Sequence, residues 1–402
     1  MLIAILGLAF LILIHEAGHF FTALAVGMRP RKFYVGFPPP LVRTRRDGIE
    51  YGIGAVPLGG YVKIPGMHRP APSDVDLHFA RAIGEHPELF SATTVIRRRL
   101  EEGDLDGAAV ALRHLEQVLG DAELSPLARR AADRGLGELG DALGPDAYWR
   151  QRTWRKVSVI VAGPGTNLVL AVVLFAILFM VGGGKVTSTV DRVQPGTPAA
   201  SVGLRPGDRI VAIDGRHVSA PQIRERITSS GGRALVLRVR RDGHGAVLGP
   251  VRPVQQEGAY RLGFVLGAQP LSPPAAMWQS VKLTGDLTRR TGAALAGIVH
   301  RKDRKQISSP VGIVQGSTEA LHEGWQAYLG LLAYLSLSLA LLNLLPLLPL
   351  DGGHIAFSLV EGIRGRAVGR HVYERVSVIG FALVLMLFFI GLSNDVGRVG
   401  GG

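Results

Sequence analysis

The stretch "ILIHEAGHFF" (12–21) places two histidines and a glutamate inside an otherwise apolar run. In a helix His15 and His19 lie four residues apart, so their side chains project from one face, one turn apart. In H-E-x-x-H sites the two histidines bind zinc, and the glutamate acts as general base on a zinc-bound water. We therefore predict His15 and His19 as metal ligands and Glu16 as the catalytic residue. The alternative is a polar cluster between helices, but such groups are costly in a membrane span and are by default functional there.

The apolar run around this motif is one of four that are long enough to cross a bilayer, which needs roughly 20 residues. They cover about 2–27, 157–181, 327–345 and 376–392. The first has neither a basic start nor a small-residue cleavage signal, so we do not expect a signal peptide. Hydrophobic residues make up 47% of the 402, and cysteine is absent, so any metal must be held by His, Asp or Glu. We expect a polytopic α-helical membrane protein with about four transmembrane helices.

Lysine and arginine indicate how these helices are oriented. They gather in "RPRK" (29–32), "RTRR" (43–46), "RQRTWRK" (150–156) and "RGRAVGRHVYER" (364–375). If every span crosses once, all four stretches fall on one side, which the positive-inside bias makes cytoplasmic. Both termini and the region of about 183–326 are then extracytoplasmic, in a multi-pass protein of the cell inner (cytoplasmic) membrane. The net charge of +13 is compatible with nucleic-acid binding, but basic residues that flank apolar spans more often mark cytoplasmic loops. We therefore expect the lipid bilayer and no nucleic acid as partner.

Two soluble modules interrupt the spans. Residues 67–149 contain "GAAVALRHLEQVLGDAEL" (107–124), whose apolar residues recur at helical spacing, and we expect three or four amphipathic helices facing the cytoplasm. This helical insertion is either a solvated appendage or a partner-binding module. Residues 185–270 hold short β-branched runs separated by Gly, Pro and Asp, with one short helix at "PQIRERITSS" (221–230), and indicate a small β-rich domain. The mixed polarity of 275–304 indicates either an interfacial amphipathic helix or a plain connecting helix.

A catalytic zinc needs three protein ligands and an open position, so a third ligand must come from elsewhere. Asp351 follows the third apolar run, where Pro346 and Pro349 break the helix and a glycine pair permits sharp turns. Irregular backbone at membrane depth is tolerated where it lines a cavity. We predict that Asp351 turns back to the metal, although it could instead cap a helix. His354 is a weaker rival, because we expect the following helix to carry it away.

Asn343 precedes the two prolines. A buried amide at this place either donates to a substrate carbonyl or oxyanion, or makes a hydrogen bond between helices. We favour the substrate role.

With these motifs together, the sequence resembles the site-2 protease family of intramembrane zinc metalloproteases, closest to its bacterial RseP/Rip-type members. The resemblance covers most of the chain outside the helical insertion. It rests on "HEAGH" (15–19), "GGYVKIPG" (59–66), "GPGTNLVLA" (163–171), "SPVGIV" (309–314) and "NLLPLLPLDGG" (343–353).

The resemblance implies zinc ligation by His15, His19 and Asp351, with Glu16 as the catalytic acid and base. It also implies a substrate-contacting Asn343, and Gly163 and Asn167 match the glycine-to-asparagine motif of the second span, which we also assign to substrate binding. The implied activity is hydrolysis of peptide bonds in or near the transmembrane helix of a membrane protein, after a first protease has trimmed it. Implied substrates of this regulated intramembrane proteolysis include anti-sigma factors and signal-peptide remnants.

The β-rich module in turn resembles a PDZ domain, on "GTPAASVGLRPGDRIVAIDG" (196–215). PDZ domains bind extended peptides by strand addition. The family resemblance implies a filter for substrate size, and capture of peptide C-termini is the competing role. The runner-up function is a non-catalytic membrane scaffold that binds client proteins through this PDZ-like domain.

A helical substrate hides its backbone and must be unwound before cleavage. "YVKI" (61–64) lies near glycines and alternates β-branched residues with others, which predicts a short strand or hairpin. Its free edge would hold an extended substrate, and an ordinary juxtamembrane hairpin is the alternative. We assign substrate binding to Tyr61, Val62, Lys63 and Ile64.

The sequence thus predicts six segments. They are 1–66 (first span and membrane-associated hairpin), 67–149 (helical insertion), 150–184 (second span), 185–270 (PDZ-like domain), 271–326 (amphipathic connector) and 327–402 (third and fourth spans).

Overall fold

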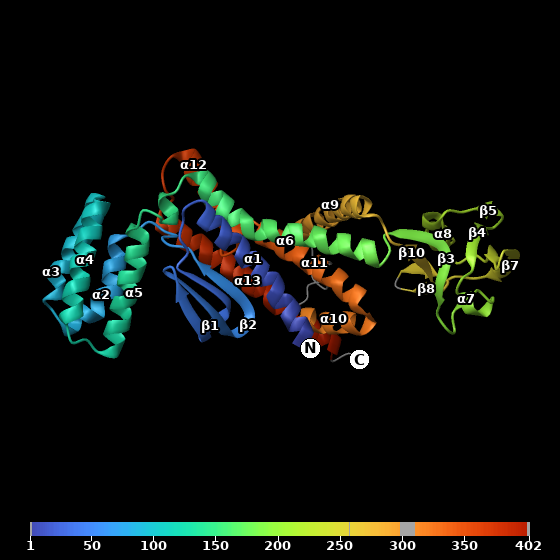
Figure 1. Cartoon of the computed structure of the whole chain (residues 1–402), viewed down its shortest axis with the longest axis horizontal. Helices are drawn as coiled ribbons and strands as arrows, with labels where there is room; N and C mark the ends of the chain where they lie inside the picture. Colours follow the sequence, from blue (N-terminus) through green and yellow to red (C-terminus); the bar gives the residue numbers. More distant parts are fainter. Residues whose placement is uncertain (1, 257, 298–309, 400–402) are drawn as a thin grey trace. The chain divides into compact units, whose positions relative to one another are not determined.

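The computed structural model describes residues 2–256, 258–297 and 310–399. Four of its helices are long and apolar enough to cross a membrane, as the sequence predicts (Figure 1). They are α1 (Leu2–Ala25), α6 (Thr153–Val181), α11 (Trp325–Asn343) and α13 (Arg370–Val399). The chain divides into two compact units. One comprises Met1–Ala171, Thr288–Gly324 and Tyr334–Gly402, and the other Val172–Leu287 and Trp325–Ala333.

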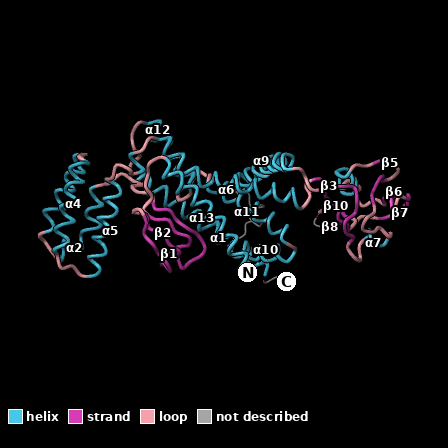
Figure 2. Tube along the Cα trace, in the orientation of Figure 1, coloured by secondary structure: helices cyan, strands magenta, loops and turns pink. Residues whose placement is uncertain are grey.

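The first unit contains a sheet built from two long strands, β1 (Lys32–Arg46) and β2 (Ile49–Lys63) (Figure 2). Both strands bend, so each supplies two segments. Phe33 pairs with Tyr51 on one side and with Val62 on the other, while Thr44 also pairs with Tyr51. The β1 segment 32–35 is therefore flanked by both halves of β2, and segment 60–63 is an edge of the sheet. This element is much larger than the short hairpin expected around 61–64.

The helical insertion is a bundle of four amphipathic helices. They are α2 (Pro72–Glu85), α3 (Leu89–Glu102), α4 (Leu105–Asp121) and α5 (Pro126–Leu143). Asp104 and Ser125 cap α4 and α5 by accepting hydrogen bonds from the backbone of Gly107 and Ala128. The apolar faces meet in a core of their own around Phe79, which is fully buried. The bundle is therefore a small packed module and not a loose loop.

Replacing Phe79 with alanine should unfold this bundle. Loss of a buried phenylalanine side chain typically costs about 3–5 kcal/mol, which is a large share of what so small a core supplies. Limited proteolysis of the full-length protein in detergent should then cut within 67–149. Leu77→Ala on the same helix is the matched control, because Leu77 is 71% exposed. Equal protease resistance of the two variants would contradict the packed core.

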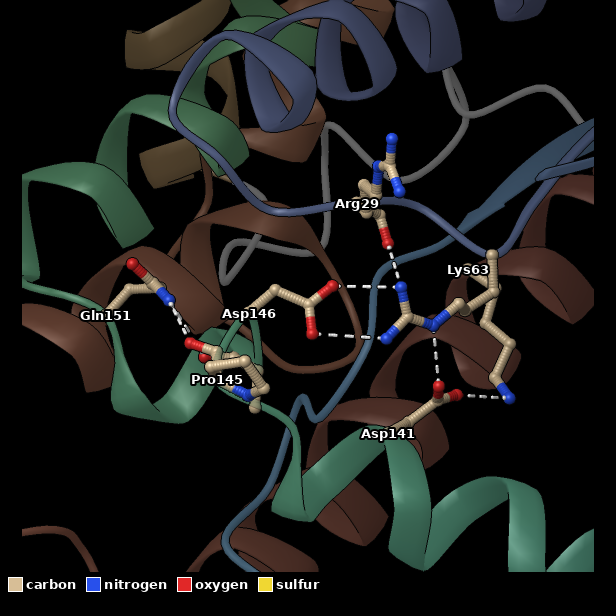
Figure 3. A network of polar contacts seen from close by, with 8 residues as sticks. Arg29, Lys63, Asp141, Pro145, Asp146 and Gln151 are labelled. Carbon is tan, nitrogen blue, oxygen red and sulfur yellow. Dashed lines mark hydrogen bonds and ion pairs between the residues drawn. The ribbon is translucent and has the colours of Figure 1, made fainter. Parts of the chain in front are cut away.

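Ion pairs tie the end of this bundle to the sheet (Figure 3). Arg31 donates to Asp141 at 2.7 Å and to both carboxylate oxygens of Asp146 at 2.9 and 3.1 Å. The ammonium of Lys63, the last residue of the edge segment, lies 2.8 Å from the other oxygen of Asp141. The backbone continues the link, since the Tyr148 amide donates to the carbonyl of Pro65. The insertion is thus joined directly to the edge segment.

The second unit contains a β-rich fold. Its main sheet has the strand order β10-β3-β4-β6-β7, with β5 beside β4, and β8 and β9 form a separate pair. The strands are β3 (Lys185–Val193), β4 (Arg209–Ile213), β5 (Arg216–His217), β6 (Leu235–Arg241), β7 (His244–Val251), β8 (Val254–Gln256), β9 (Ala259–Arg261) and β10 (Phe264–Gln269). Two short helices accompany them, α7 (Pro198–Ser201) and α8 (Ala220–Thr228), the latter where the sequence predicts one. Strand β7, whose run "HGAVLGPV" contains two glycines and a proline, was not expected.

The β-rich fold buries alternate residues of its strands. In β6, Leu235, Leu237 and Val239 point into the core while the residues between them are exposed. A buried carboxylate, Asp208, accepts two hydrogen bonds of 2.7 Å from Arg241. These bonds hold the pKa of Asp208 below its usual range.

Four further helices complete the described chain. They are η1 (Tyr148–Arg150), α9 (Pro273–Gly297), α10 (Pro310–Glu323) and α12 (Asp351–Arg364). Helices α9 and α10 occupy the described part of the expected connector 271–326, of which residues 298–309 lie outside the described chain.

Candidate active site

Two histidines of α1 and one aspartate of α12 converge on a point. The Nε2 atoms of His15 and His19 lie 3.3 Å apart, and Asp351 Oδ2 lies 3.1 and 3.3 Å from them. Ligand atoms about 2.0–2.1 Å from a tetrahedral zinc are separated by roughly 3.3 Å. Among the described residues these three form a group that could hold a metal ion. The three atoms therefore have the mutual spacing that ligands of a tetrahedral zinc ion would have.

The hydrogen bond made by His19 also suits a metal ligand. His19 Nδ1 lies 2.8 Å from the carbonyl oxygen of Val159 in α6, so it carries the proton and leaves the lone pair of Nε2 free. Asp351 Oδ2 is buried with no hydrogen-bond donor among the described residues. A buried carboxylate oxygen beside two imidazole nitrogens needs a cation, and a divalent metal meets that need.

Close packing of α6 on α1 confines the ring of His19. A Cβ on Gly163 would lie 2.2 Å from His19 Nε2, and a Cβ on Gly18 would lie 2.5 Å from the carbonyl oxygen of Ala162. Thr166 adds a hydrogen bond of 3.1 Å to the carbonyl oxygen of Ile14. Only glycine at 163 leaves room for the His19 ring.

Asp351 reaches the site because the chain breaks before it. Helix α11 ends at Asn343 and α12 begins at Asp351, with an irregular loop between them. The glycines that follow lie inside the first turn of α12 and not at a sharp turn, which the sequence had suggested. A Cβ on Gly352 would lie 2.1 Å from the carbonyl oxygen of Leu345, and one on Gly353 would lie 2.6 Å from the amide of Leu348. Both glycines let the loop fold back over the helix.

A cavity of about 410 Å³ opens at this point. Its lining includes the three convergent residues together with Glu16, Asn343 and His354. The edge segment of the sheet forms another wall through Tyr61 and Val62, with Ile64 just beyond it. A Cβ on Gly60 would lie 3.2 Å from Glu16 Cγ, so this glycine lets the strand approach the glutamate.

Three residues assigned to substrate binding lie away from this lining. Lys63 pairs with Asp141 of the insertion, and Gly163 packs under His19. Asn167 is fully buried, and neither atom of its side-chain amide has a hydrogen-bond partner within the described chain.

His354 lies outside the convergent group, consistent with its ranking below Asp351, but it stays closer to the site than expected. The helix does not carry it away, because α12 starts at Asp351 and His354 follows three residues later, on the same face. It lines the cavity without joining the convergent group. The i,i+3 spacing from Asp351 was the signal that could have found it. The glycine pair at 59 and 60 was likewise missed as part of the wall.

An H-E-x-x-H pair on an apolar helix, completed by an aspartate from a second apolar region, defines a membrane-embedded metalloprotease. The chain belongs to peptidase family M50, whose model matches residues 3–387. This confirms the resemblance to the site-2 proteases. The protein is therefore a multi-pass, zinc-dependent metalloendopeptidase of the cytoplasmic (inner) membrane.

Similar proteins extend over nearly the whole chain. A Brucella suis biovar 1 protein named "putative zinc metalloprotease" is 29% identical over 409 residues, covering 97% of this chain and 93% of its own length. A Rhizobium meliloti protein of the same name is 30% identical over 409 residues, covering 97% and 94%. The Enterococcus faecalis "probable protease eep" is 26% identical over 413 residues, covering 96% of each.

Proposed function

We propose that this protein hydrolyses peptide bonds in or next to the transmembrane helix of single-span membrane proteins, as a step of regulated intramembrane proteolysis. The observation that carries the proposal is the convergence of His15, His19 and Asp351 at a cavity bordered by apolar helices and a strand edge. His15, His19 and Asp351 hold the metal. Zinc, when bound, polarises the scissile carbonyl and makes water a nucleophile at neutral pH.

Glu16 acts as general base and then as general acid. It takes a proton from the attacking water as the new C–O bond forms, and returns a proton to the amine nitrogen as the C–N bond breaks. Its position on α1 next to the edge segment supports this role, because a substrate held on that edge lies beside the carboxylate. Asn343 donates to a substrate carbonyl, and its place in the lining of the cavity supports this role.

The substrate binds as an added strand on the edge of the sheet. Segment 60–63 of β2 pairs with β1 on one side, and Tyr61 and Val62 line the cavity with Ile64 next to them. Pairing with this edge compensates the backbone hydrogen bonds that a substrate helix loses when it unwinds. Lys63 contributes by anchoring the segment to Asp141. The contacts of Gly163 support a role in seating His19, and burial of Asn167 supports a similar role inside the helix packing.

The positive-inside pattern supports the topology proposed for the rest of the chain. The insertion 67–149 faces the cytoplasm, and the termini and the β-rich module 185–270 face the opposite side. We assign that module as PDZ-like, acting either as a size filter or in capture of peptide C-termini. Anti-sigma factors and signal-peptide remnants are the substrate classes proposed.

Cysteine cross-linking tests strand addition, since the chain has no cysteine of its own. Val62→Cys is placed in a Glu16→Gln background, and single cysteines are moved along the transmembrane segment of a protein that accumulates in membranes of that strain. Cross-links should recur at every second substrate position, the period of a strand. Arg45→Cys, on the outer segment of β1, is the control and should give none. A period of three to four positions would mean that the substrate stays helical and would refute the pairing.

A further inference from the structure

We infer that His354 is a further catalytic residue, which donates a hydrogen bond from its Nε2–H to the carbonyl oxygen of the scissile bond, with Tyr373 fixing the ring in that state. This inference rests on the proposed function and names a group that stabilises its transition state. Two observations support it. The imidazole of His354 lines the catalytic cavity, and among the described residues only one of its ring nitrogens has a hydrogen-bond partner.

The position of His354 suits this role. It lies on α12 three residues after Asp351 and lines the cavity together with Glu16. It is outside the group of three convergent ligand atoms. A carbonyl that approaches the metal site from the edge segment therefore enters a cavity with Glu16 and His354 in its walls.

Tyr373 of α13 sets the protonation state of the ring. Its hydroxyl is hydrogen-bonded to His354 Nδ1. We assign the hydroxyl as the donor to Nδ1, and because a neutral imidazole carries a single proton, that proton then lies on Nε2. Within the described chain no hydrogen bond engages Nε2, which leaves this N–H for a ligand.

Two aromatic rings hold Tyr373 in place. The centroids of His68 and Phe357 each lie 4.6 Å from that of Tyr373. His68 comes from the segment that leads into the helical insertion, and Phe357 from the next turn of α12. Packing against these two rings limits the movement of the Tyr373 ring, and so of the hydroxyl that contacts His354.

His354 also stays neutral near pH 7. Burial in the protein lowers the pKa of its imidazole to about 4. A neutral N–H donor adds no positive charge beside a divalent metal. It keeps its proton throughout the reaction, while Glu16 carries the proton from water to the leaving amine.

The hydrogen bond from His354 stabilises the reaction most after water has attacked the scissile carbonyl. When water adds to the carbonyl, the oxygen becomes an oxyanion, and an N–H aimed at it stabilises that charge more than it stabilises the ground-state carbonyl. Loss of one such donor typically lowers kcat by about 10²–10³-fold. Loss of this hydrogen bond should therefore lower kcat and leave KM nearly unchanged, because the bond is strongest in the transition state.

The test uses the full-length, zinc-loaded protein in liposomes with a fluorogenic single-span peptide as probe. His354→Leu should lower kcat by about 10²–10³-fold with KM and zinc content retained. His354→Gln, whose amide N–H reaches the place of Nε2–H, should recover part of kcat. The shape of the pH profile of kcat/KM should not change, because His354 does not titrate near neutrality. Full kcat in His354→Leu would overturn the inference, and loss of zinc would make His354 a ligand instead.

A pair of tyrosine variants separates positioning from packing. Tyr373→Phe removes one hydrogen bond and should lower kcat by about tenfold. Tyr148→Phe removes a hydroxyl that lies 3.0 Å from the Ser358 hydroxyl on α12, the helix of His354, and should leave kcat unchanged. Equal losses in both variants would indicate a structural effect and refute the positioning role. The proposed function is tested separately. If it is wrong, the Glu16→Gln variant will still cleave the peptide, whatever the His354 variants show.

Discussion

Glu16→Gln is expected to abolish cleavage while the protein keeps its zinc. Glutamine has nearly the same size and shape but cannot take a proton from water, and general acid–base groups typically contribute about 10²–10⁴-fold. Glu16 is not one of the three convergent ligands, so the metal site should survive. Zinc content by elemental analysis and turnover of a fluorogenic single-span peptide measure the two properties on one sample.

The control for this substitution is Glu102→Gln. Glu102 ends α3 on the surface of the insertion, where loss of its charge removes only exposed ion pairs of little energy. In cells, comparative membrane proteomics of the Glu16→Gln strain should reveal a single-span protein that accumulates. Normal turnover by Glu16→Gln would exclude this residue as the base and with it the proposed mechanism.

Gly163→Ala is expected to remove zinc without unfolding α6. A methyl group at this position would lie 2.2, 2.5 and 2.8 Å from three atoms of the His19 ring. The ring cannot yield easily, because its Nδ1 is bonded to the carbonyl of Val159. Loss of a group that only hydrogen-bonds to a metal ligand lowers metal affinity by about 10–100-fold. Displacement of a ligand itself should lower the affinity further.

Gly165→Ala is the matched control, since nothing lies within 4 Å of a Cβ at that position of the same helix. Alanine is favoured over glycine in a helix interior by about 0.5–1 kcal/mol, so neither variant should lose helicity. Zinc content and activity should fall in Gly163→Ala only, with circular dichroism unchanged in both. Full zinc occupancy in Gly163→Ala would show that the ring can shift and that the close approach is not essential.

Local patterns were enough to predict the four apolar helices and to propose a chemistry for the site. An apolar run of sufficient length must be helical in lipid, because the helix satisfies its backbone groups internally. His15 and His19 share a face by helix geometry alone. Asp351 could be proposed as their partner because two prolines break the helix just before it, and because a carboxylate beside an apolar span is costly unless it is paired.

The sheet could not be predicted in the same way. Proline and glycine within β1 and β2 argue against long strands, yet both strands run for 15 residues because they bend and pair with each other twice. The pairing register of β1 and β2 depends on residues that are distant in the sequence, and a local sequence pattern does not show which of them pair. The same limit explains why Gly163 was assigned to substrate and not to the ring of His19.

The sequence by itself determined that the chain is a membrane protein with an H-E-x-x-H helix and an acidic residue beyond a broken span, because hydropathy and helical period are local properties. Only the tertiary structure decided that the three ligand atoms lie 3.1–3.3 Å apart, that a strand edge borders Glu16, and that His354 faces the same cavity. These distances depend on how closely α6 packs on α1 and how far the loop before α12 folds back. Glycines allow both close approaches because they have no side chain. Which glycines matter can be recognised only when the positions of the neighbouring atoms are known.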